Sequence, residues 1–309
     1  MASEALRTRF IASTDGRRLR VGVWDSAAGA PGRGFCAIFD GQTEFLEKYE
    51  EVVGELAARG FAGAILDWRG QGGSERLVAD PRKAYVVDFS DYDGDLSAFL
   101  DQVVAPETAA PPIALAHSMG AHILLRALHR RPRAFSAAVM SAPMLRTGTH
   151  GWPRWLARAI TFAHVRTGLG KDWIWGMGGR DPLRVAFADN FVTSDRARFA
   201  RNRAYLERDP ALRLAGPTWG WLDAAWRSMD AMEAPGFAEA IATPCLVFGA
   251  GRDRIVETPA IRDFARRLPR GRYVEIPAAE HEILMENDSI RARFWRAFDD
   301  FVDVYKPRP

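Results

Sequence analysis

The chain has 309 residues, of which 48% are apolar, so it can bury a large core as one domain with an insertion or as two small domains. Its formal net charge of +3 is mild and does not by itself indicate a nucleic-acid partner. The two cysteines, Cys36 and Cys245, lie inside predicted strands, and nothing suggests a disulfide framework or a metal site.

The N-terminal residues 1–10 contain no apolar stretch of signal-peptide length, and no run of the chain approaches the length of a membrane span. We therefore expect a cytoplasmic protein, and attachment to a membrane surface remains open.

Most of the chain alternates strand and helix patterns. Residues 6–25 alternate apolar and polar side chains around a turn at 14–17, which predicts a β-hairpin. Further strands are expected at 35–39, 62–66, 113–116, 137–140, 245–249 and 272–276. Helices are expected at 45–59, 91–104, 120–130, 258–268 and 287–305. This alternation predicts an α/β fold, with a mostly parallel sheet and helices on both of its faces.

The alternation is interrupted after residue 144. From 145 to 236 no strand–helix pattern is visible, and seven of the ten tryptophans fall in this segment. It also contains 14 Lys and Arg against 9 Asp and Glu. We predict a core formed by residues 1–144 and 237–309, and a helical cap, residues 145–236, inserted into it.

A glycine-rich loop at 67–74 follows the strand expected at 62–66. Glycines after a strand can bind phosphate, but this loop lacks the spacing of the known phosphate-binding motifs. We interpret it as a tight loop that ends at Ser74.

Residues 116–120 read Ala-His-Ser-Met-Gly, between an apolar strand pattern and a helix pattern. A serine at a sharp strand-to-helix turn, with small residues two positions before and after it, is typical of the nucleophile elbow of an α/β-hydrolase. Ala116 stands where the usual pattern has glycine, and it still satisfies the size requirement. Ser118 is therefore a candidate nucleophile, and the alternative is that it only caps the following helix.

Two further polar residues follow predicted strands. Asp253 lies in the loop after the strand at 245–249, and His281 lies in the loop after the strand at 272–276. Active-site residues of open parallel sheets lie beyond the carboxyl ends of strands, and this fold places serine, acid and histidine in that order along the chain. Asp253 could instead cap a helix, and His281 could be a surface residue. Taken together, the three positions predict a catalytic triad of Ser118, His281 and Asp253.

Four motifs resemble the lysophospholipase and monoacylglycerol lipase branch of the α/β-hydrolases. They are residues 39–45 (FDGQTEF), 67–72 (DWRGQG), 116–120 (AHSMG) and 280–282 (EHE). In the predicted cap, residues 190–195 (NFVTSD) and 216–221 (GPTWGW) are similar to bacterial lysophospholipase-type members. The resemblance covers nearly the whole chain and implies an α/β-hydrolase fold that needs no cofactor or metal.

By the same resemblance, the backbone N–H groups of Gln42 and Met119 form the oxyanion hole, the site that binds the negatively charged oxygen of the reaction intermediate. Many relatives have a histidine where this chain has Asp40. We expect Asp40 to place a negative charge near the oxyanion loop, where it could weaken the stabilisation of an anion.

An apolar stripe with helical spacing begins the predicted cap. Its members are Trp152, Trp155, Leu156, Ala159, Ile160 and Ala163. The stripe either packs on the core or on other cap helices, or part of it lines an acyl-chain tunnel or touches lipid. Aromatic residues beside basic ones are typical of helices at a membrane interface. The candidate substrate-binding residues of the cap are Trp152, Trp155, Trp219 and Trp221.

These observations predict a serine hydrolase that cleaves single-chain lipid esters, either a lysophospholipid or a monoacylglycerol, through an acyl-enzyme. A general carboxylesterase, an acyltransferase and an aminopeptidase on the same triad remain alternatives, because fold does not decide between them. We expect no nucleic-acid partner. The headgroup, the acyl-chain length and the oligomeric state stay open.

Overall fold

The computed structural model describes residues 6–30, 32–149, 151–176 and 178–305. The ends of the predicted core, residues 1–5 and 306–309, lie outside the described residues. The described residues form one eight-stranded sheet with the strand order β1-β2-β4-β3-β5-β6-β7-β8. The strands are β1 (Arg7–Ala12), β2 (Arg18–Trp24), β3 (Gly34–Phe39), β4 (Phe61–Leu66), β5 (Ile113–His117), β6 (Ala137–Ser141), β7 (Cys245–Ala250) and β8 (Gly271–Ile276).

Six strands run parallel, in the order β4, β3, β5, β6, β7 and β8 across the sheet. The hairpin formed by β1 and β2 joins this parallel part through an antiparallel pairing of β2 with β4. The carboxyl ends of the parallel strands therefore meet at one edge of the sheet, as the sequence predicts.

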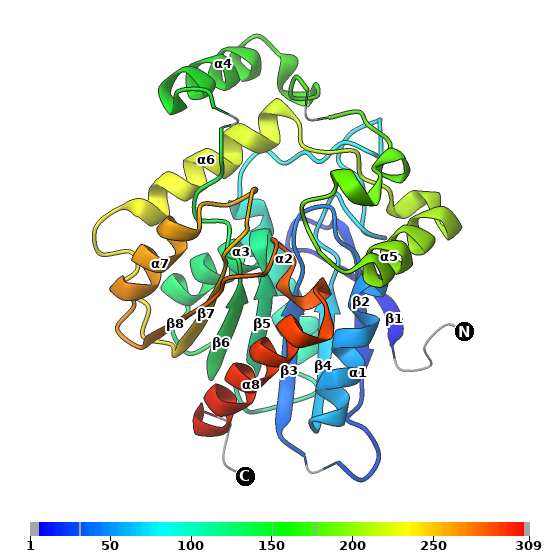
Figure 1. The fold of residues 1–309 in the computed structure, drawn as a ribbon, viewed down its shortest axis with the longest axis vertical. Helices are drawn as coiled ribbons and strands as arrows, with labels where there is room; N and C mark the ends of the chain where they lie inside the picture. Colours follow the sequence, from blue (N-terminus) through cyan, green and yellow to red (C-terminus); the bar gives the residue numbers. More distant parts are fainter. Residues whose placement is uncertain (1–5, 31, 150, 177, 306–309) are drawn as a thin grey trace.

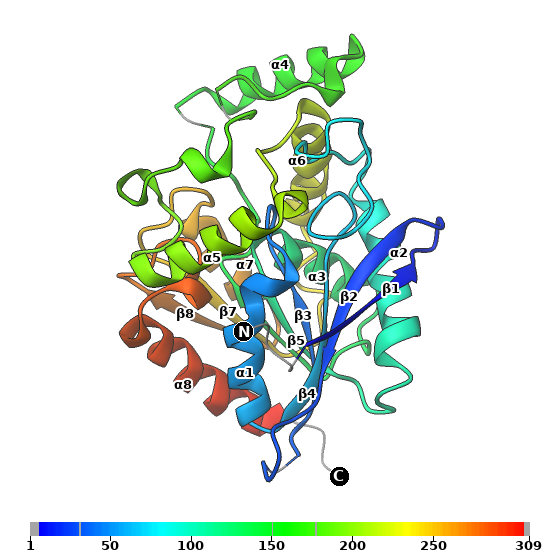
Figure 2. The ribbon, with the colours of Figure 1, turned by 90° about the vertical axis from the view of Figure 1, so that its right-hand side faces the viewer.

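Helices cover both faces of the sheet (Figures 1 and 2). One face packs against α1 (Glu50–Ala58) and α8 (Asp288–Tyr305). The other packs against α2 (Ser90–Phe99), α3 (Ser118–Arg130) and α7 (Thr258–Arg267). Successive strand residues enter opposite cores, as a strand requires: Ile38 joins the α1 and α8 core, and Phe39 joins the α2 and α3 core. The predicted α/β-hydrolase fold is confirmed.

Two predicted helices differ in detail from the observed ones. The helix expected at 45–59 begins as a 3₁₀ turn, Leu46–Tyr49, before α1 starts. Within the helix expected at 91–104, α2 ends at Phe99, and the chain continues as one π-helical turn, Leu100–Val104. Apolar spacing locates a helix but does not distinguish a 3₁₀ turn or a π turn from an α-helix, because each of these can present an apolar face to the core.

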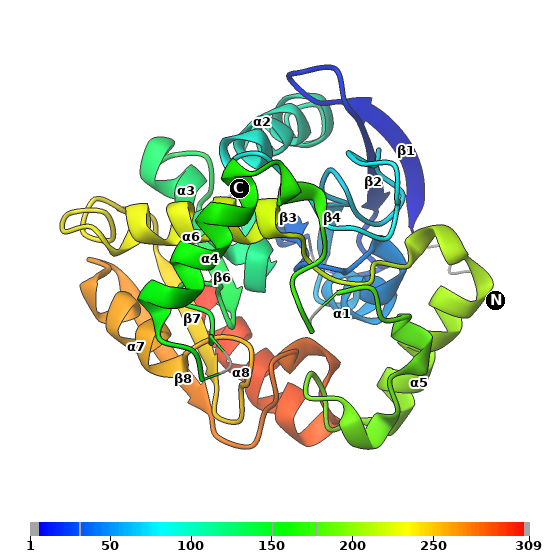
Figure 3. The ribbon, with the colours of Figure 1, turned by 90° about the horizontal axis from the view of Figure 1, so that it is seen from above.

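Three α-helices and four short 3₁₀ helices lie in the described part of the chain between β6 and β7, and this part contributes no strand to the sheet. The α-helices are α4 (Arg154–Arg166), α5 (Arg196–Arg208) and α6 (Trp219–Glu233). Figures 2 and 3 show α4 farthest from the sheet, with α6 between α4 and the strands, and α5 to one side. This arrangement agrees with a helical cap over the carboxyl edge of the sheet, and the predicted domain boundaries remain a proposal.

None of the helices in the described part of the chain is long and apolar enough to cross a membrane.

Candidate active site

Ser118 lies at a strained turn between β5 and α3. It is the first residue of α3, directly after the last residue of β5. Its φ of 49° is in the left-handed region, which residues other than glycine rarely adopt. A Cβ atom on Gly120 would lie 2.4 Å from the carbonyl oxygens of both Phe39 and Asp40. The turn therefore packs directly on the end of β3. Ala116 fits inside β5, between its strand partners on β3 and β6.

The structure brings Ser118, His281 and Asp253 into one chain of hydrogen bonds. The Ser118 hydroxyl lies 3.0 Å from His281 Nε2, and His281 Nδ1 lies 2.7 Å from Asp253 Oδ2. In this arrangement the hydroxyl donates to Nε2, and the protonated Nδ1 donates to the carboxylate. Ser118 is 7% exposed and His281 4% exposed, so these contacts are largely sheltered from water.

Asp253 is held as an acceptor for the imidazole. Its other oxygen, Oδ1, accepts hydrogen bonds from the backbone N–H groups of Ile255 at 2.8 Å and Val256 at 3.0 Å. Burial alone would raise the pKa of Asp253. The hydrogen bond from His281 and the two N–H groups outweigh burial, so the pKa lies below its ordinary value. The carboxylate is therefore ionised at neutral pH and faces Nδ1 of His281.

The loop that carries Gln42 lies beside this turn. A Cβ atom on Gly41 would come within 2.9 Å of the His117 ring, next to Ser118 in the chain. The Gly41 N–H donates to Glu44, and the Thr43 N–H lies 3.3 Å from Gln71 Oε1. The N–H groups of Gln42 and Met119 donate to no other residue in the part of the chain described. They are thus available to an external acceptor, and their role as an oxyanion hole remains a prediction.

Comparison with known proteins identifies the family. The profile of the Hydrolase_4 family, described as "Serine aminopeptidase, S33", matches residues 30–288. Lysophospholipase L2 of Escherichia coli strain K12 is 35% identical over 272 residues, which cover 85% of this chain and 78% of that protein. The chain belongs to this family of α/β-hydrolases. The "Probable lysophospholipase L2" of Haemophilus influenzae is 25% identical over 88% of this chain and 84% of its own length.

Solved structures agree with the fold of this hydrolase. A soluble variant of monoglyceride lipase from Saccharomyces cerevisiae, crystallised with a substrate analogue, superposes with a TM-score of 0.76. The two chains are 17% identical, and the match covers 99% of this chain and 98% of the yeast chain. At that identity the likeness shows the fold alone.

The hydrolase buries Asp40 completely, which changes the expectation of a negative charge beside the oxyanion loop. Burial, together with the nearby carboxylates of Asp67 and Glu44, raises the pKa of Asp40 well above its ordinary value. The Asp40 carboxyl group therefore keeps its proton to a higher pH than an exposed aspartate does, which disfavours a negative charge on the loop. The main-chain oxygen of Asp40 accepts a 3.0 Å hydrogen bond from the Trp68 indole, which fixes the start of the loop.

The glycine-rich loop binds a carboxylate of the protein itself. The Asp67 side chain accepts hydrogen bonds from the Gly73 N–H at 2.7 Å and the Leu46 N–H at 3.0 Å. A Cβ atom on Gly72 would fall about 2.1 Å from that carboxyl group. Ser74 closes the loop with a 2.6 Å hydrogen bond to the Asp67 main chain. The loop is thus the tight structure that the sequence predicts, closed around the Asp67 carboxylate.

The four tryptophans proposed for the cap fall into two pairs. Trp152 and Trp155 are 53% and 71% exposed, so the alternative in which the apolar stripe packs on the core does not hold for them. Trp219 and Trp221 are buried at the start of α6, where Trp219 stacks on the ring of His164 at 4.3 Å. The role of these four residues in substrate binding stays a prediction.

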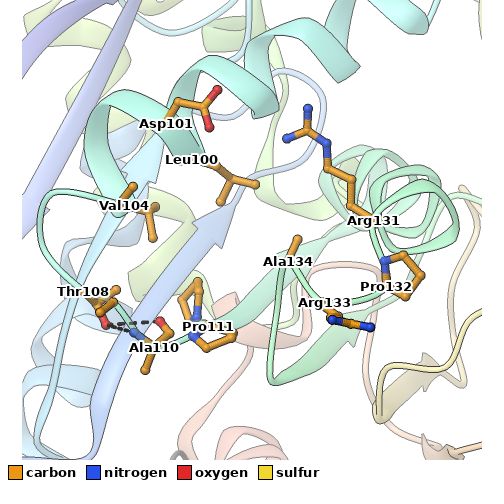
Figure 4. Close-up of a pocket in the computed structure, with 13 residues that line it drawn as sticks. Leu100, Asp101, Val104, Thr108, Ala110, Pro111, Arg131, Pro132, Arg133 and Ala134 are labelled. Atoms are coloured by element: carbon orange, nitrogen blue, oxygen red, sulfur yellow. Dashed lines mark hydrogen bonds between the residues drawn. The ribbon is translucent and has the colours of Figure 1, made fainter.

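A groove of about 540 Å³ lies elsewhere on the molecule (Figure 4). Its lining comes from residues 100–112, which precede β5, and 131–134, which precede β6. It therefore lies at the amino ends of the parallel strands, opposite Ser118, and has no part in the site. Within the described residues, no group of three or more His, Cys, Asp and Glu side chains is placed to hold a metal ion.

The sequence did not reveal two features that surround the triad. The buried ring of His117 lies 4.8 Å from that of His281, and burial lowers the pKa of His117 to about 4, so it packs there as a neutral ring. A buried cluster of charges, Glu44, Lys48 and Glu282, lies behind the same loops. Only spatial proximity reveals these contacts, because Lys48 and Glu282 are 234 residues apart.

Proposed function

We propose that this carboxylic ester hydrolase cleaves single-chain lipid esters, either lysophospholipids or monoacylglycerols, with Ser118, His281 and Asp253 as its catalytic triad. The observation that carries the proposal is the chain of hydrogen bonds from Ser118 Oγ through His281 to Asp253, at 3.0 and 2.7 Å. The 35% identity to E. coli lysophospholipase L2 supports a lipid ester as the substrate.

The geometry supports a mechanism in two halves. Ser118 Oγ attacks the ester carbonyl carbon while His281 Nε2 accepts the hydroxyl proton. Collapse of the tetrahedral intermediate breaks the bond to the leaving alcohol, which takes that proton from His281. A water molecule then attacks the acyl-enzyme, again with His281 as base, and releases the fatty acid and free Ser118. Asp253 orients the imidazole and stabilises its charged form throughout, without itself accepting the proton.

The negatively charged oxygen of each intermediate requires donors that are already in place. The N–H groups of Gln42 and Met119 are unused by the described residues. Gln42 lies in the loop after β3, and Met119 lies in the first turn of α3, which packs on that loop. Loss of one such donor typically costs roughly 2.7–4 kcal/mol of transition-state stabilisation. The raised pKa of Asp40, beside Gly41, is compatible with this role, because it disfavours a second negative charge next to the developing one.

The purified protein should be screened against lysophosphatidylcholine, monoacylglycerol and nitrophenyl esters of two to twelve carbons. We expect turnover of a lipid ester and higher kcat/KM for long acyl chains, since each buried methylene contributes about 0.8 kcal/mol. Ser118→Ala should abolish turnover while leaving the circular dichroism spectrum unchanged. Full activity of that variant would reject the triad. Activity that falls steadily with chain length would favour a general esterase, and cleavage of amino-acid nitroanilides alone would favour an aminopeptidase.

We further infer that α4 lies against a lipid surface when the enzyme acts. Its outer side exposes Trp155 and Phe162 at 71% and 60%, and Trp152 stands just before the helix. Arg154 and Arg158 are close to these rings in the sequence, and they pair with the carboxylates of Glu257 and Asp230. Exposed aromatic rings on one side of a helix suit the interface of a bilayer, where the rings enter the apolar region.

The variant Trp152→Ala/Trp155→Ala tests this contact against the matched control Phe10→Ala, which removes an exposed ring from β1 on another part of the molecule. The double variant should lose binding to anionic phosphatidylglycerol vesicles and activity on vesicle-bound substrate, while it keeps its activity on a soluble nitrophenyl ester. The control should retain all three. Equal vesicle binding by the double variant and the wild type would contradict the membrane contact without affecting the proposed chemistry.

A further inference from the structure

A buried lysine joins two carboxylates behind the candidate active site. Lys48 Nζ lies 2.7 Å from Glu44 Oε1 and donates a 2.6 Å hydrogen bond to Glu282 Oε1. The side chains of Lys48, Glu44 and Glu282 are only 8%, 3% and 11% exposed. Although burial alone would lower the pKa of Lys48, the two carboxylates raise it above its ordinary value, so the ammonium group remains charged.

Each carboxylate belongs to a different loop of the site. The second oxygen of Glu44 accepts hydrogen bonds from the Gly41 N–H and, at 2.7 Å, from the Tyr49 hydroxyl. Glu44 therefore fixes the peptide between Asp40 and Gly41, one residue before the Gln42 N–H group. Glu282 directly follows His281, and its own N–H donates a 2.8 Å hydrogen bond to the carbonyl of Val192. Lys48 is thus the middle of a continuous chain of polar contacts from the proposed oxyanion loop to the histidine loop.

Stability alone is a weak explanation for this arrangement. Removing three charges from water costs roughly as much as their mutual attraction returns, and apolar side chains of similar volume often replace buried ion pairs without loss. Catalysis, by contrast, requires the Gln42 N–H and the His281 imidazole to keep a fixed separation around one reacting carbonyl. A rigid ionic link between their loops supplies such a constraint.

We propose that Lys48 is a positioning residue that holds the oxyanion loop, through Glu44, in register with the histidine loop, through Glu282. This proposal rests on the proposed function, because the Gln42 N–H and His281 must act on the same ester. Lys48 touches neither Ser118 nor His281 among the contacts described, so it acts only through its two carboxylate partners.

The variant Lys48→Met keeps most of the side-chain volume and removes the link. We expect kcat on a nitrophenyl ester to fall about 10- to 100-fold with KM nearly unchanged, because a displaced donor weakens the transition state more than the bound substrate. Lys48→Arg, which can still span two carboxylates, should recover most of the loss. The matched control is Arg69→Met, which removes another buried cation between two carboxylates, Asp15 and Asp95, in contacts separate from the triad. The control should lose stability but keep its kcat.

The double variant Lys48→Met/Glu282→Gln separates positioning from charge neutralisation. It removes one of the two carboxylates that Lys48→Met leaves without their cation, so thermal stability should partly return while kcat stays low. A double variant that regains wild-type kcat would overturn the proposal, and so would an unchanged kcat in Lys48→Met. If Lys48→Met does not fold, Glu282→Ala cuts the same link, and an unchanged kcat in that variant would overturn the proposal equally.

The two proposals fail in different ways. Absence of ester turnover by the wild type, or full activity of Ser118→Ala, would reject the proposed function. A wild type that is active and depends on Ser118, together with a Lys48→Met variant of unchanged kcat, would reject only the positioning role.

Discussion

Two glycines in helices should respond to alanine with opposite signs. Gly120 is the third residue of α3, and a Cβ atom there would lie 2.4 Å from two main-chain oxygens at the end of β3. Gly54 lies in the middle of α1, is exposed, and has no atom within 4 Å of its ideal Cβ position. The added methyl group is the same in both variants, so only the surroundings differ.

The structure sets the size of each effect. The contact at residue 120 is about 1 Å shorter than van der Waals contact allows, and both atoms it meets belong to the backbone, so α3 or the loop after β3 must move. Such overpacking costs about 3 kcal/mol, and the better helix propensity of alanine offsets about 1 kcal/mol. Gly120→Ala should therefore lose about 2 kcal/mol of stability. Gly54→Ala has only the propensity gain, about 1 kcal/mol.

Thermal unfolding and ester kinetics check both variants. At about 2 °C per kcal/mol for a chain of this size, Gly120→Ala should melt about 4 °C below the wild type and Gly54→Ala about 2 °C above it. A shift of about 1 Å between Ser118 and the loop of Gln42 should also reduce kcat by about 100-fold in Gly120→Ala, with none in Gly54→Ala. A Gly120→Ala variant as stable and active as the wild type would refute the packing of the elbow on β3.

Two further predictions concern the charges of the site. Asp253→Asn keeps the shape of the side chain but removes the acceptor that selects the His281 tautomer, so kcat should fall about 10³- to 10⁴-fold; a change below tenfold in steady-state kinetics would contradict the triad. Asp40→Asn should stabilise the protein more at pH 8 than at pH 5. The raised pKa of Asp40 means that the folded state binds a proton which the unfolded state releases above about pH 4, so this group makes stability fall as the pH rises. Urea unfolding of both proteins at the two pH values checks this, and an equal difference at both would show that Asp40 is ionised in the fold.

The fold was predictable because its signals are local. The central strands of the core are short apolar runs, its helices repeat apolar residues with helical spacing, and the elbow around Ser118 combines a strand end, a small-residue turn and a helix start within five residues. The order of Asp253 and His281 after two later strands then places both at the edge where Ser118 lies. Parallel pairing of β5, β6, β7 and β8 brings the three together, as the alternation of strands and helices implies.

The cap was less predictable because helical spacing identifies an apolar face but not what covers it. The stripe that includes Trp155 has the pattern of a packed helix, yet only Thr161 of α4 is fully buried. α4 packs on α6 and the turn after α4, and these partners leave the side that carries Trp155 and Phe162 open. A pattern within thirteen residues carries no information about a neighbour sixty residues away.

Electrostatics of the site depends even more strongly on distant residues. Residue type alone suggests that Asp40 is negative, whereas burial beside Asp67 and Glu44 favours its neutral form. Residue type alone also suggests that Lys48 is a solvated surface charge on a helix, whereas its side chain is buried and pairs with Glu282, which lies near the other end of the chain. Both groups lie next to the loop that carries Gln42, where burial raises the pKa of Asp40 and two carboxylates pair with the Lys48 ammonium group. The loop therefore obtains its electrostatic environment from tertiary contacts, which explains why a motif match can locate Gln42 but cannot determine how well its N–H group stabilises an anion.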